Sequence, residues 1–354
     1  MSLENKLINK HTVSSYFARA HMHNGITLGG NEQQILSQAG LTLPQLMQGK
    51  SRILPTQLAS VVKSCWQLSG DELLGFAEQK IKLGMFSLLA ERLIRCKSLA
   101  EVFSQSAAFY TLSGDQLQLK IARSASQVRV SISINFKKSP NIKPTPSLLT
   151  ELLLLICHRF ASWLVGQVIP LSEVNVQHVK PEHHEEYQLM YPCLCNYQSR
   201  DNALVFDASY LNLAVVQKPD DLSSYLKQIP LQWFKKQNYY ESCSAQVVQI
   251  LENAAQEKGA KLENVAAILN LTSRTLRRKL VAEGSRFQQL KDNTRRDKAI
   301  TLFEQSNLSL GQISLACGFT ELATFSRAFK HWTGVPPNTY RNYHSQRALP
   351  IKGK

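Results

Sequence analysis

Three arginines at helical spacing could give this chain the means to recognise nucleic acid. Arg274, Arg277 and Arg278 fall on one side of a helix. Leu276 and Leu280 are four residues apart and fall on another side, as core residues do. A guanidinium can donate paired hydrogen bonds to O6 and N7 of guanine, and it also binds phosphate. We therefore expect this segment to enter a DNA major groove and to bury its leucines.

A second stretch, residues 318–334, shows the same division into two faces. Phe325, Phe329 and Trp332 recur at i, i+4 and i+7, which is the usual spacing of a core-facing aromatic stripe. The polar residues on the opposite face are Thr324, Arg327 and His331. We expect the aromatic face to be core and the polar face to meet a second major groove.

Both stretches belong to an internal repeat. Residues 265–280, VAAILNLTSRTLRRKL, align with residues 313–329, ISLACGFTELATFSRAF, at an offset of 48 that becomes 49 after one inserted residue. Each copy reads as helix, tight turn, helix, with Asn270 or Gly318 at the turn, and these types tolerate a left-handed backbone. The repeated unit is a helix-turn-helix.

Capping residues mark where the helices of each copy begin. Thr272 and Thr320 follow the two turns and are expected to be the N-caps of the second helices. Ser309 with Gln312 has the spacing of a capping box that would open the second copy. These signals support two separate helix-turn-helix units.

A long helix is expected between the two units. Residues 287–306, FQQLKDNTRRDKAITLFEQS, have a helical pattern, and about twenty residues at 1.5 Å rise span roughly 30 Å. One turn of B-DNA is about 34 Å, so the two units could enter successive major grooves. Arg296 lies on this helix, where we expect it to meet solvent or phosphate.

The net charge favours a polyanionic partner. The chain carries +15, and residues 241–354 hold 17 Lys and Arg against 9 Asp and Glu. Cations that neutralise phosphates release condensed counterions, which drives binding to nucleic acid. Charge alone also occurs on merely solvated faces, so the repeat is the stronger argument.

An ordered series of residues in the last third carries a family resemblance. The series is Thr272, Arg274, Leu276, Arg278, Gly284, Phe287, Arg295, Ala299, Leu302, Ile313, Ala316, Gly318, Phe319, Phe325, Arg327, Phe329, Lys330, Gly334, Pro337, Tyr340 and Arg341. With it, residues 245–344 resemble the DNA-binding domain of AraC/XylS-type transcriptional regulators. The resemblance implies double-stranded DNA as the partner, gripped in two successive major grooves.

The resemblance also assigns the residues that would read bases. It implies Arg274, Arg277 and Arg278 in the first unit and Ala323, Thr324 and Arg327 in the second. Two positions depart from the family pattern: Arg286 stands where a small hydroxyl residue is common, and Ala323 where a longer polar side chain is. We expect less direct readout from the second unit. The full set of expected DNA-binding residues is Arg274, Thr275, Arg277, Arg278, Lys279, Ala323, Thr324, Arg327 and Lys330.

The first 240 residues predict an α+β domain. LQLKIARSASQVRVSISINF alternates like a strand pair, a buried helix is expected near 148–167, and VNVQHV and NALVFD read as further strands. The order AGL, Gly84, SLAEVF, Pro170 with Val174, and NALVFD resembles the arabinose-binding-type sensing domain of AraC-type regulators, such as those of ornithine use and of mycobacterial virulence. That likeness implies a small-molecule effector, whose identity the sequence does not give.

Histidine and cysteine gather in one stretch that could bind a soft metal. The residues are His178, His183, His184, Cys193 and Cys195. The paired Cys-x-x-Cys spacing is missing, and adjacent histidines in a strand would point to opposite faces. We expect exposed loop histidines and small core cysteines, with no metal or other cofactor. A metal- or redox-sensing regulator that uses Cys193 and Cys195 is an alternative.

Enzyme motifs are missing from the sequence. It has no phosphate-binding Gly-rich loop, no G-x-S-x-G and no H-E-x-x-H. A DNA-repair methyltransferase can carry a similar double helix-turn-helix, and it is the runner-up class. Its Pro-Cys-His-Arg acceptor sequence is replaced here by Pro192-Cys193-Leu194-Cys195. We therefore expect a regulator and not an enzyme.

The sequence favours a cytoplasmic protein with reduced thiols. The N-terminus has charges where a signal peptide would be apolar, and the most apolar window is interrupted by Glu151, His158 and Arg159. The seven cysteines are scattered and odd in number, unlike a disulfide framework.

The expected organisation is an α+β sensing domain followed by an all-α domain of two helix-turn-helix units joined by a long helix. The boundaries are 1–216 for the sensing domain, 217–244 for a linker, 245–344 for the DNA-binding domain with units near 262–283 and 310–333, and 345–354 for a basic tail. In the linker, Leu231, Trp233 and Phe234 form either a docking contact or a core patch. We expect a transcription activator, with RNA polymerase as a partner, no membrane, and a homodimer as one oligomeric state open to it.

Overall fold

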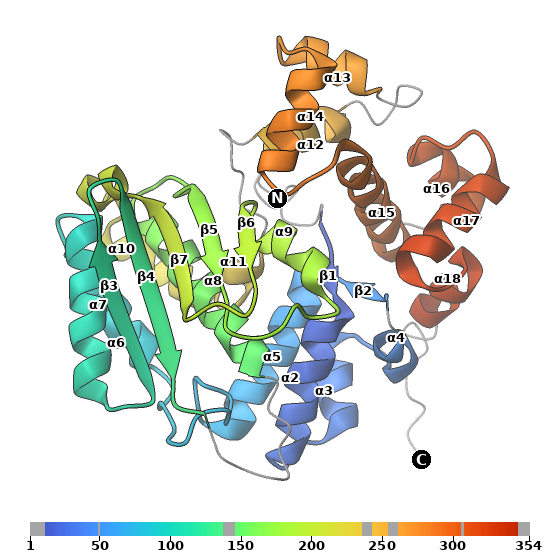
Figure 1. Ribbon diagram of the computed structural model, residues 1–354. Helices are drawn as coiled ribbons and strands as arrows, with labels where there is room; N and C mark the ends of the chain where they lie inside the picture. The colour runs from blue at the N-terminus through green and yellow to red at the C-terminus, as the bar shows by residue number, and fades with distance from the viewer. Residues whose placement is uncertain are drawn as a thin grey trace. The chain divides into compact units, whose positions relative to one another are not determined.

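The computed structural model describes residues 11–48, 50–136, 146–235, 243–253, 261–305 and 308–345. The chain divides into two compact units, which we describe separately (Figure 1). The sheet unit contains Ala20–Asn31 and Val62–Gln237, and the helical unit contains Met1–Arg19, Glu32–Val61 and Asn238–Lys354. Most of the expected basic tail, residues 346–354, lies outside the described residues.

A five-stranded sheet with the order β3-β4-β7-β5-β6 forms the centre of the sheet unit. The strands are β3 (Leu117–Arg123), β4 (Gln127–Ile134), β5 (Leu171–Asn175), β6 (Leu194–Asn196) and β7 (Asn202–Asp207). The expected hairpin is confirmed, because β3 and β4 pair antiparallel with Leu117 opposite Ile134. The strand expected at VNVQHV, residues 174–179, is β5, which begins earlier, at Leu171, and ends at Asn175. Strand β6, which pairs parallel to β5, was not predicted.

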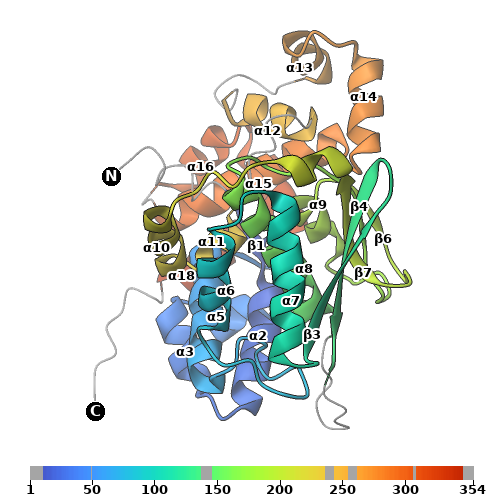
Figure 2. The same ribbon diagram turned by 90° about the vertical axis from the view of Figure 1, so that its left-hand side faces the viewer.

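Helices cover one face of this sheet. The helices of the unit are α6 (Met85–Leu93), α7 (Leu99–Ser113), α8 (Pro146–Leu164), α9 (Tyr187–Met190), α10 (Pro219–Lys227) and α11 (Leu231–Phe234). Figure 2 shows α7 and α8 against the sheet, and α7 contacts β3 while α8 contacts β4 and β7. Helix α8 is long and apolar enough to span a membrane, but 78% of its apolar window is buried inside the protein, as in a core helix.

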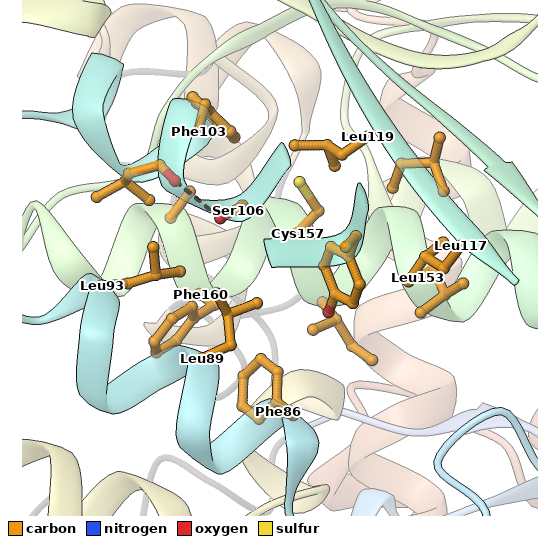
Figure 3. Close-up of a pocket in the computed structure, with 15 residues that line it drawn as sticks. Phe86, Leu89, Leu93, Phe103, Ser106, Leu117, Leu119, Leu153, Cys157 and Phe160 are labelled. Carbon is orange, nitrogen blue, oxygen red and sulfur yellow. Dashed lines mark hydrogen bonds between the residues drawn. The ribbon is translucent and has the colours of Figure 1, made fainter. Parts of the chain in front are cut away.

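The core of the unit lies between these helices and the sheet, and Figure 3 shows its aromatic and aliphatic side chains. The alternation of β4 places Val128, Val130 and Ile132 in this core, where each is at most 4% exposed. The prediction of an α+β fold for the N-terminal domain is therefore confirmed.

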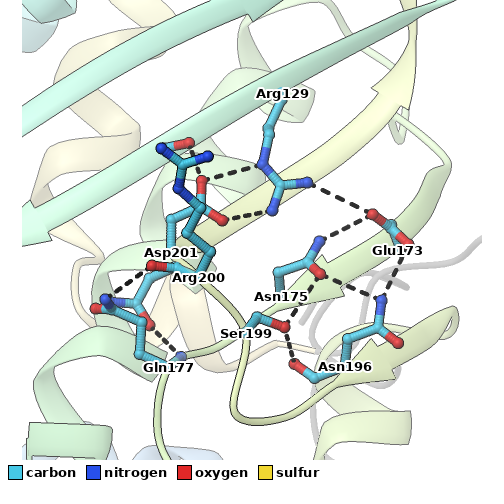
Figure 4. A network of polar contacts seen from close by, with 10 residues as sticks. Arg129, Glu173, Asn175, Gln177, Asn196, Ser199, Arg200 and Asp201 are labelled. Carbon is cyan, nitrogen blue, oxygen red and sulfur yellow. Dashed lines mark hydrogen bonds and ion pairs between the residues drawn. The ribbon is translucent and has the colours of Figure 1, made fainter.

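Polar side chains occupy the opposite face of the sheet (Figure 4). The Nε of Arg129 donates to Asp201 Oδ2 at 3.0 Å, and its Nη1 lies 3.6 Å from Glu173 Oε1. Asn175 and Asn196 each donate to Glu173 at 3.0 Å. Because the ion pairs are about one third exposed, we expect them to contribute little stability each.

Part of the expected linker is folded into the sheet unit. Helices α10 and α11 occupy residues 219–234, and Trp233 is 2% exposed. Its ring lies 5.6 Å from that of Trp66 and 5.4 Å from that of Phe86, in edge-to-face geometry. Of the two predictions for this patch, a docking contact or a core patch, Trp233 therefore fits the core patch. Residues 236–242 of the expected linker lie outside the described residues.

The helical unit consists mainly of the C-terminal helices. They are α12 (Cys243–Asn253), α13 (Leu262–Ile268), α14 (Ser273–Ala282), α15 (Phe287–Gln305), α16 (Leu310–Ala316), α17 (Leu322–Thr333) and α18 (Pro337–Ser345). Two hydrophobic cores hold them, one around Leu276 and Leu280 and one around Phe325 and Phe329. Each helix-turn-helix copy therefore buries its own apolar face.

Segments from the start of the chain also belong to the helical unit. Strand β1 (Val13–Ser14) pairs antiparallel with β2 (Arg52–Ile53), and α4 (Leu43–Met47) contacts α18. Helix α3 (Glu32–Ala39) is assigned to the same unit, and α2 (Ser15–Thr27) and α5 (Pro55–Ser69) contribute residues to both units. Each compact unit therefore combines segments that lie far apart in the sequence, and the expected bounds of 1–216 for the sensing domain stay a prediction.

Candidate nucleic-acid interface

The first helix-turn-helix has the expected backbone and cap. Asn270 adopts a left-handed φ of 55° at the turn. The hydroxyl of Thr272 then accepts a hydrogen bond from the backbone N–H of Thr275 at 3.1 Å, which fixes the start of α14. Leu276 and Leu280 are at most 1% exposed and anchor α14 in its core. Helices α13 and α14 of this unit span residues 262–268 and 273–282.

The outer face of α14 is strongly cationic. Arg274, Arg277, Arg278 and Lys279 are all exposed, and Thr275 is half-buried. No acidic residue occurs between Ser273 and Ala282. Four positive charges thus share one exposed helix, which is the arrangement that direct base readout and phosphate contact require.

The second helix-turn-helix begins differently from our expectation. The capping box of Ser309 and Gln312 is confirmed, with hydrogen bonds of 3.3 Å and 2.8 Å. The prediction of Thr320 as the next N-cap is wrong, because Glu321 holds the extended N-cap position and makes no side-chain cap bond. Gly318 takes a left-handed φ of 78° at the turn, as the repeat predicted.

The outer face of α17 carries fewer charges than that of α14. Phe325 and Phe329 are fully buried, while the four expected contact residues, Ala323, Thr324, Arg327 and Lys330, are exposed. Arg327 Nη2 lies 3.5 Å from the hydroxyl of Thr324, which in turn points to the carboxylate of Glu321 at 3.4 Å. This face therefore carries two cations and a nearby carboxylate, whereas α14 carries four cations.

Two arginines hold the second unit in place, Arg295 on α15 and Arg341 on α18. Arg295 lies over the ring of Phe319 at 4.8 Å, and its Nη2 donates to the carbonyl of Gly318 at 3.3 Å. Arg341 donates to the carbonyl of Leu308 at 2.6 Å. Burial is the largest cause that lowers the pKa of Arg295 from its ordinary value. The turn of the second unit is thereby fastened to α15.

A carboxylate performs a similar function for the first unit. The two oxygens of Glu283 each accept a backbone N–H at the start of α12, from Cys243 and Ser244, at 2.7 Å. Negative charge at a helix N-terminus is favourable because of the helix dipole. Helix α12 in turn contacts both α14 and α15, so it connects α14 to the same helix, α15, that contacts the second unit.

Arg296 does not occupy the position we expected. It is 8% exposed, and its Nε donates to Asp297 Oδ1 at 3.1 Å. The prediction that it meets solvent or phosphate is wrong, because its face of α15 is turned into the protein.

Sequence reasoning missed a cationic groove beside α14. The groove has a volume of about 540 Å³, and Lys261, Arg277, Arg286 and Lys291 line it. Burial, followed by the charge of Arg295, lowers the pKa of Lys291 from its ordinary value. Lys261 and Arg286 are far apart in the sequence, so no local pattern joins them. The sequence signal for a cationic cluster here is the i, i+4 spacing of Lys291 and Arg295 on one helix.

The histidine and cysteine stretch forms a buried polar cluster. His183 is 9% exposed, and its Nε2 lies 2.9 Å from Glu151 Oε1, while the hydroxyl of Tyr187 donates to the same oxygen at 2.8 Å. The expectation of an exposed loop is therefore wrong for His183. Within the residues that the structure describes, no three His, Cys, Asp or Glu side chains are placed to share a metal ion.

Cys193 is poorly suited to thiol chemistry. Cys193 is 6% exposed, and hydrogen bonding with Cys195, together with burial, raises the pKa of its thiol far above the ordinary value. A protonated thiol is a weak nucleophile and a weak metal ligand. All seven cysteines are free, and the structure gives no support to methyl transfer or redox sensing at Cys193.

Two family models match the chain. Residues 29–215 match the arabinose-binding domain of AraC transcription regulators, N-terminal part, and residues 265–343 match a helix-turn-helix domain. The first match agrees with the α+β part of the chain and the second with helices α13 to α18.

Similar curated proteins are transcription regulators. The chain is 25% identical over 220 residues to the HTH-type regulator VqsM of Pseudomonas aeruginosa, a match that covers 61% of this chain and 66%, just under two thirds, of that protein. It is 22% identical over 322 residues to the ornithine utilization regulator of the same species, covering 88% and 91%. It is 27% identical over 222 residues to the urease operon transcriptional activator of Escherichia coli, covering 61% and 72%.

Solved structures of AraC-type regulators are only remotely similar in shape. The transcriptional regulator CdpR of Pseudomonas aeruginosa aligns with 92% of this chain and 98% of its own at 18% identity, with a TM-score of 0.33. A likeness this remote carries no weight for function. The arabinose-binding-type match alone covers more than half of the chain, and its relatives are regulators and not enzymes. The chain therefore belongs to the AraC family of transcription regulators.

Proposed function

We propose that this chain binds specific double-stranded DNA with α14 and α17 in two successive major grooves. The observation that carries the proposal is the pair of exposed polar helices, each with its own buried core, fastened to one connecting helix. Helix α15 has 19 residues, which at 1.5 Å per residue is close to one turn of B-DNA.

The two units contribute unequally. Helix α14 supplies most of the base contacts through Arg274, Arg277 and Arg278, with Thr275 and Lys279 beside them. Helix α17 adds Ala323, Thr324, Arg327 and Lys330, a face with fewer cations. The groove lined by Lys261, Arg286 and Lys291 receives the phosphate backbone, because cations beside a base-reading helix set its register.

The sheet unit provides regulation. We assign it the binding of a small-molecule effector, which biases the affinity or geometry of the helical unit on DNA. The protein acts in the cytoplasm as an activator, with RNA polymerase as a partner and a homodimer as its expected form on paired sites. Support for activation comes from family membership and from the likeness to an activator of a urease operon.

The test begins with selection of a preferred duplex from a random pool with the full chain. Arg277→Ala is then compared on the selected duplex and on a random duplex at two salt concentrations. Loss of a base contact should cost about 1–3 kcal/mol on the selected duplex and much less on the random one. Arg123→Ala is the matched control, because Arg123 is exposed at the end of β3 and its loss changes the net charge equally.

Equal losses on both duplexes for Arg277→Ala would show that α14 does not read bases. Lys291→Ala provides the complementary measurement. It should weaken both duplexes by a similar factor and reduce the salt dependence of binding, as expected for a phosphate contact. An unchanged salt dependence would remove the groove from the interface.

A further inference from the structure

We propose that the sheet unit binds an amphipathic molecule, with an apolar chain or ring in an inner chamber and an oxygen-bearing polar head in an adjoining outer chamber. The proposal rests on the effector-sensing role given above and names the chemical class of the effector. It differs from what the name of the N-terminal family suggests, because the lining of these chambers is unsuited to a sugar.

The inner chamber lies between α6, α7, α8 and the sheet (Figure 3). It has a volume of about 60 Å³, and side chains such as Leu89, Leu119 and Phe160 line it. Two hydroxyls line it, those of Ser106 and Tyr110, and that of Ser106 already donates to the carbonyl of Val102 at 2.8 Å. Burial raises the pKa of the Cys157 thiol to about 12, so that the thiol stays neutral. The chamber therefore offers a ligand apolar contact and almost no polar partner.

The outer chamber is larger and adjoins the inner one. Its volume is about 360 Å³, within the range of sites that hold small molecules. Five residues line both chambers: Phe86, Tyr110, Leu117, Leu153 and Ile156. A single elongated molecule that occupies both chambers passes between these side chains.

Hydrogen-bond donors predominate in the outer chamber. Lys63 and Lys227 line it, and the indole N–H of Trp66 is buried without a hydrogen-bond partner among the described residues. The carboxylate of Glu72 is the opposing acceptor, but it already accepts the backbone N–H groups of Gly84 at 2.8 Å and Phe86 at 2.9 Å. A ligand head that accepts hydrogen bonds, such as a hydroxyl, carbonyl or carboxylate, fits this set of donors.

The same lining disfavours sugars and amino acids. A sugar carries a hydroxyl on nearly every carbon, and each buried hydroxyl without a partner is costly. Among the described side chains of the inner chamber, Ser106 already donates to Val102 and Tyr110 carries the one other hydroxyl, which is too few partners for a sugar. An amino acid would place its charged ammonium beside Lys63 and Lys227, with Glu72 as the sole carboxylate among the described residues that line the chamber.

The direct test is calorimetric titration of the full chain with four probes below their micelle concentrations: dodecanoate, dodecanol, L-arabinose and L-ornithine. We expect the two amphipathic probes to bind at least fiftyfold more tightly than the two polar ones. Quenching or enhancement of tryptophan fluorescence should accompany binding, since Trp66 and Trp233 line the outer chamber. Equal affinities for all four probes would overturn the proposal.

A pair of variants at one position tests the inner chamber. Cys157→Phe fills it and should weaken dodecanol and dodecanoate at least tenfold, whereas Cys157→Ser keeps the volume and should stay within threefold. Should Cys157→Phe lose its far-ultraviolet helix signal, Ala161→Leu narrows the same chamber by less and is used instead. Equal affinity of a folded filling variant and the serine variant overturns the assignment of the chamber.

Trp66→Phe tests the outer chamber, because it keeps an aromatic side chain, although a smaller one, and removes the N–H donor. It should weaken both amphipathic probes about fivefold, and unchanged affinity would remove Trp66 from the head-group site.

Affinity for the selected duplex, measured with and without dodecanol, separates this proposal from the general function. Binding of the probes with unchanged DNA affinity supports the cavity and removes its role in regulation. Failure of both amphipathic probes, with specific DNA binding intact, overturns the cavity and leaves the DNA-binding function standing.

Discussion

Arg52 and Asp297 meet in one buried cluster although they lie far apart in the chain. The Nε of Arg52 is 3.9 Å from Asp297 Oδ1, and the hydroxyl of Thr12 bridges them with two contacts of 2.6 Å. Burial alone would raise the pKa of Asp297, but the charges of Arg296, Arg52 and His11 and the hydrogen bond from Thr12 together outweigh it, and the net shift is downward. The ionised carboxylate is therefore the form that the folded protein stabilises.

Replacement of Asp297 should destabilise the helical unit. Asp297→Asn leaves Arg52 and Arg296 buried without their counter-charge, and loss of one partner of a buried ion pair costs about 3–5 kcal/mol. Urea unfolding followed by circular dichroism measures the change, with Asp292→Asn on the same helix as the control. Because the pKa of Asp297 is depressed on folding, its contribution is present above the ordinary value of 3.8 and is lost as the pH falls below it. Equal midpoints for the two variants would contradict this assignment.

A fragment that begins near Cys243 should fold but lose stability. It keeps both hydrophobic cores, and it lacks Thr12 and Arg52, which compensate Asp297 in the full chain. We expect Asp297→Asn to cost clearly less in this fragment than in the full chain, because part of the network is already gone. The comparison is a double-mutant cycle. The same cost in both would show that the N-terminal segments do not interact with Asp297 in solution.

Arg277 and Arg296 should separate DNA recognition from stability. Arg296→Ala should lower the free energy of unfolding and leave the ratio of specific to random DNA affinity unchanged, because the side chain is buried beside Asp297. Arg277→Ala should lower that ratio and leave the unfolding midpoint nearly unchanged, because the side chain is exposed. Melting curves and binding isotherms of both variants measure the two effects. A lowered ratio of specific to random affinity for Arg296→Ala would show that Arg296 contributes to DNA recognition.

The stability of the sheet unit should depend on the protonation of Glu72. Burial raises the pKa of Glu72 from 4.5 to about 7, despite hydrogen bonds from Phe86 and Gly84 that lower it. Between these values the folded state holds a proton that the unfolded state has released, so the free energy of unfolding falls as the pH rises. Glu72→Gln removes this dependence. Its melting temperature relative to the natural chain should be higher at pH 8 than at pH 5.

Two buried histidines change the free energy of unfolding with pH in the opposite direction, so the measurement has to be a difference between two proteins. Burial lowers the pKa values of His21 and His158 to about 3, so their contribution to stability grows as the pH rises from about 3 to 6.5. They are present in both proteins, and the difference between natural chain and variant cancels them. Glu78→Gln, at an exposed position, should show no such difference. A pH-independent gap for Glu72→Gln would exclude Glu72 as the titrating group.

The sequence predicted those features that depend on neighbouring residues. The turns at Asn270 and Gly318, the cap at Thr272 and the two faces of α14 follow from spacing within about twenty residues. Thr320 was misjudged by one position, because several residues near a helix start have cap chemistry and packing selects among them.

Features that depend on distant contacts were not predictable. Arg296 was placed on the wrong face because α15 packs against elements on more than one side. The two-chamber cavity also escaped prediction, because helices and strands from residues 63 to 233 each contribute only a few of its side chains.

The N-terminal strand pair matters for anyone who would exchange sensing domains among these regulators. A chimera joined between the last residues of α11 and the first of α12 would place foreign residues opposite Asp297 and Tyr340, whose hydroxyl donates to the carbonyl of Arg52 at 3.4 Å. Such a chimera would keep helices α14 and α17 and lose the contacts that Arg52 makes with Asp297 and Tyr340. A biosensor built from this chain should therefore carry residues 12–14 and 51–53 together with its C-terminal helices, as a discontinuous module.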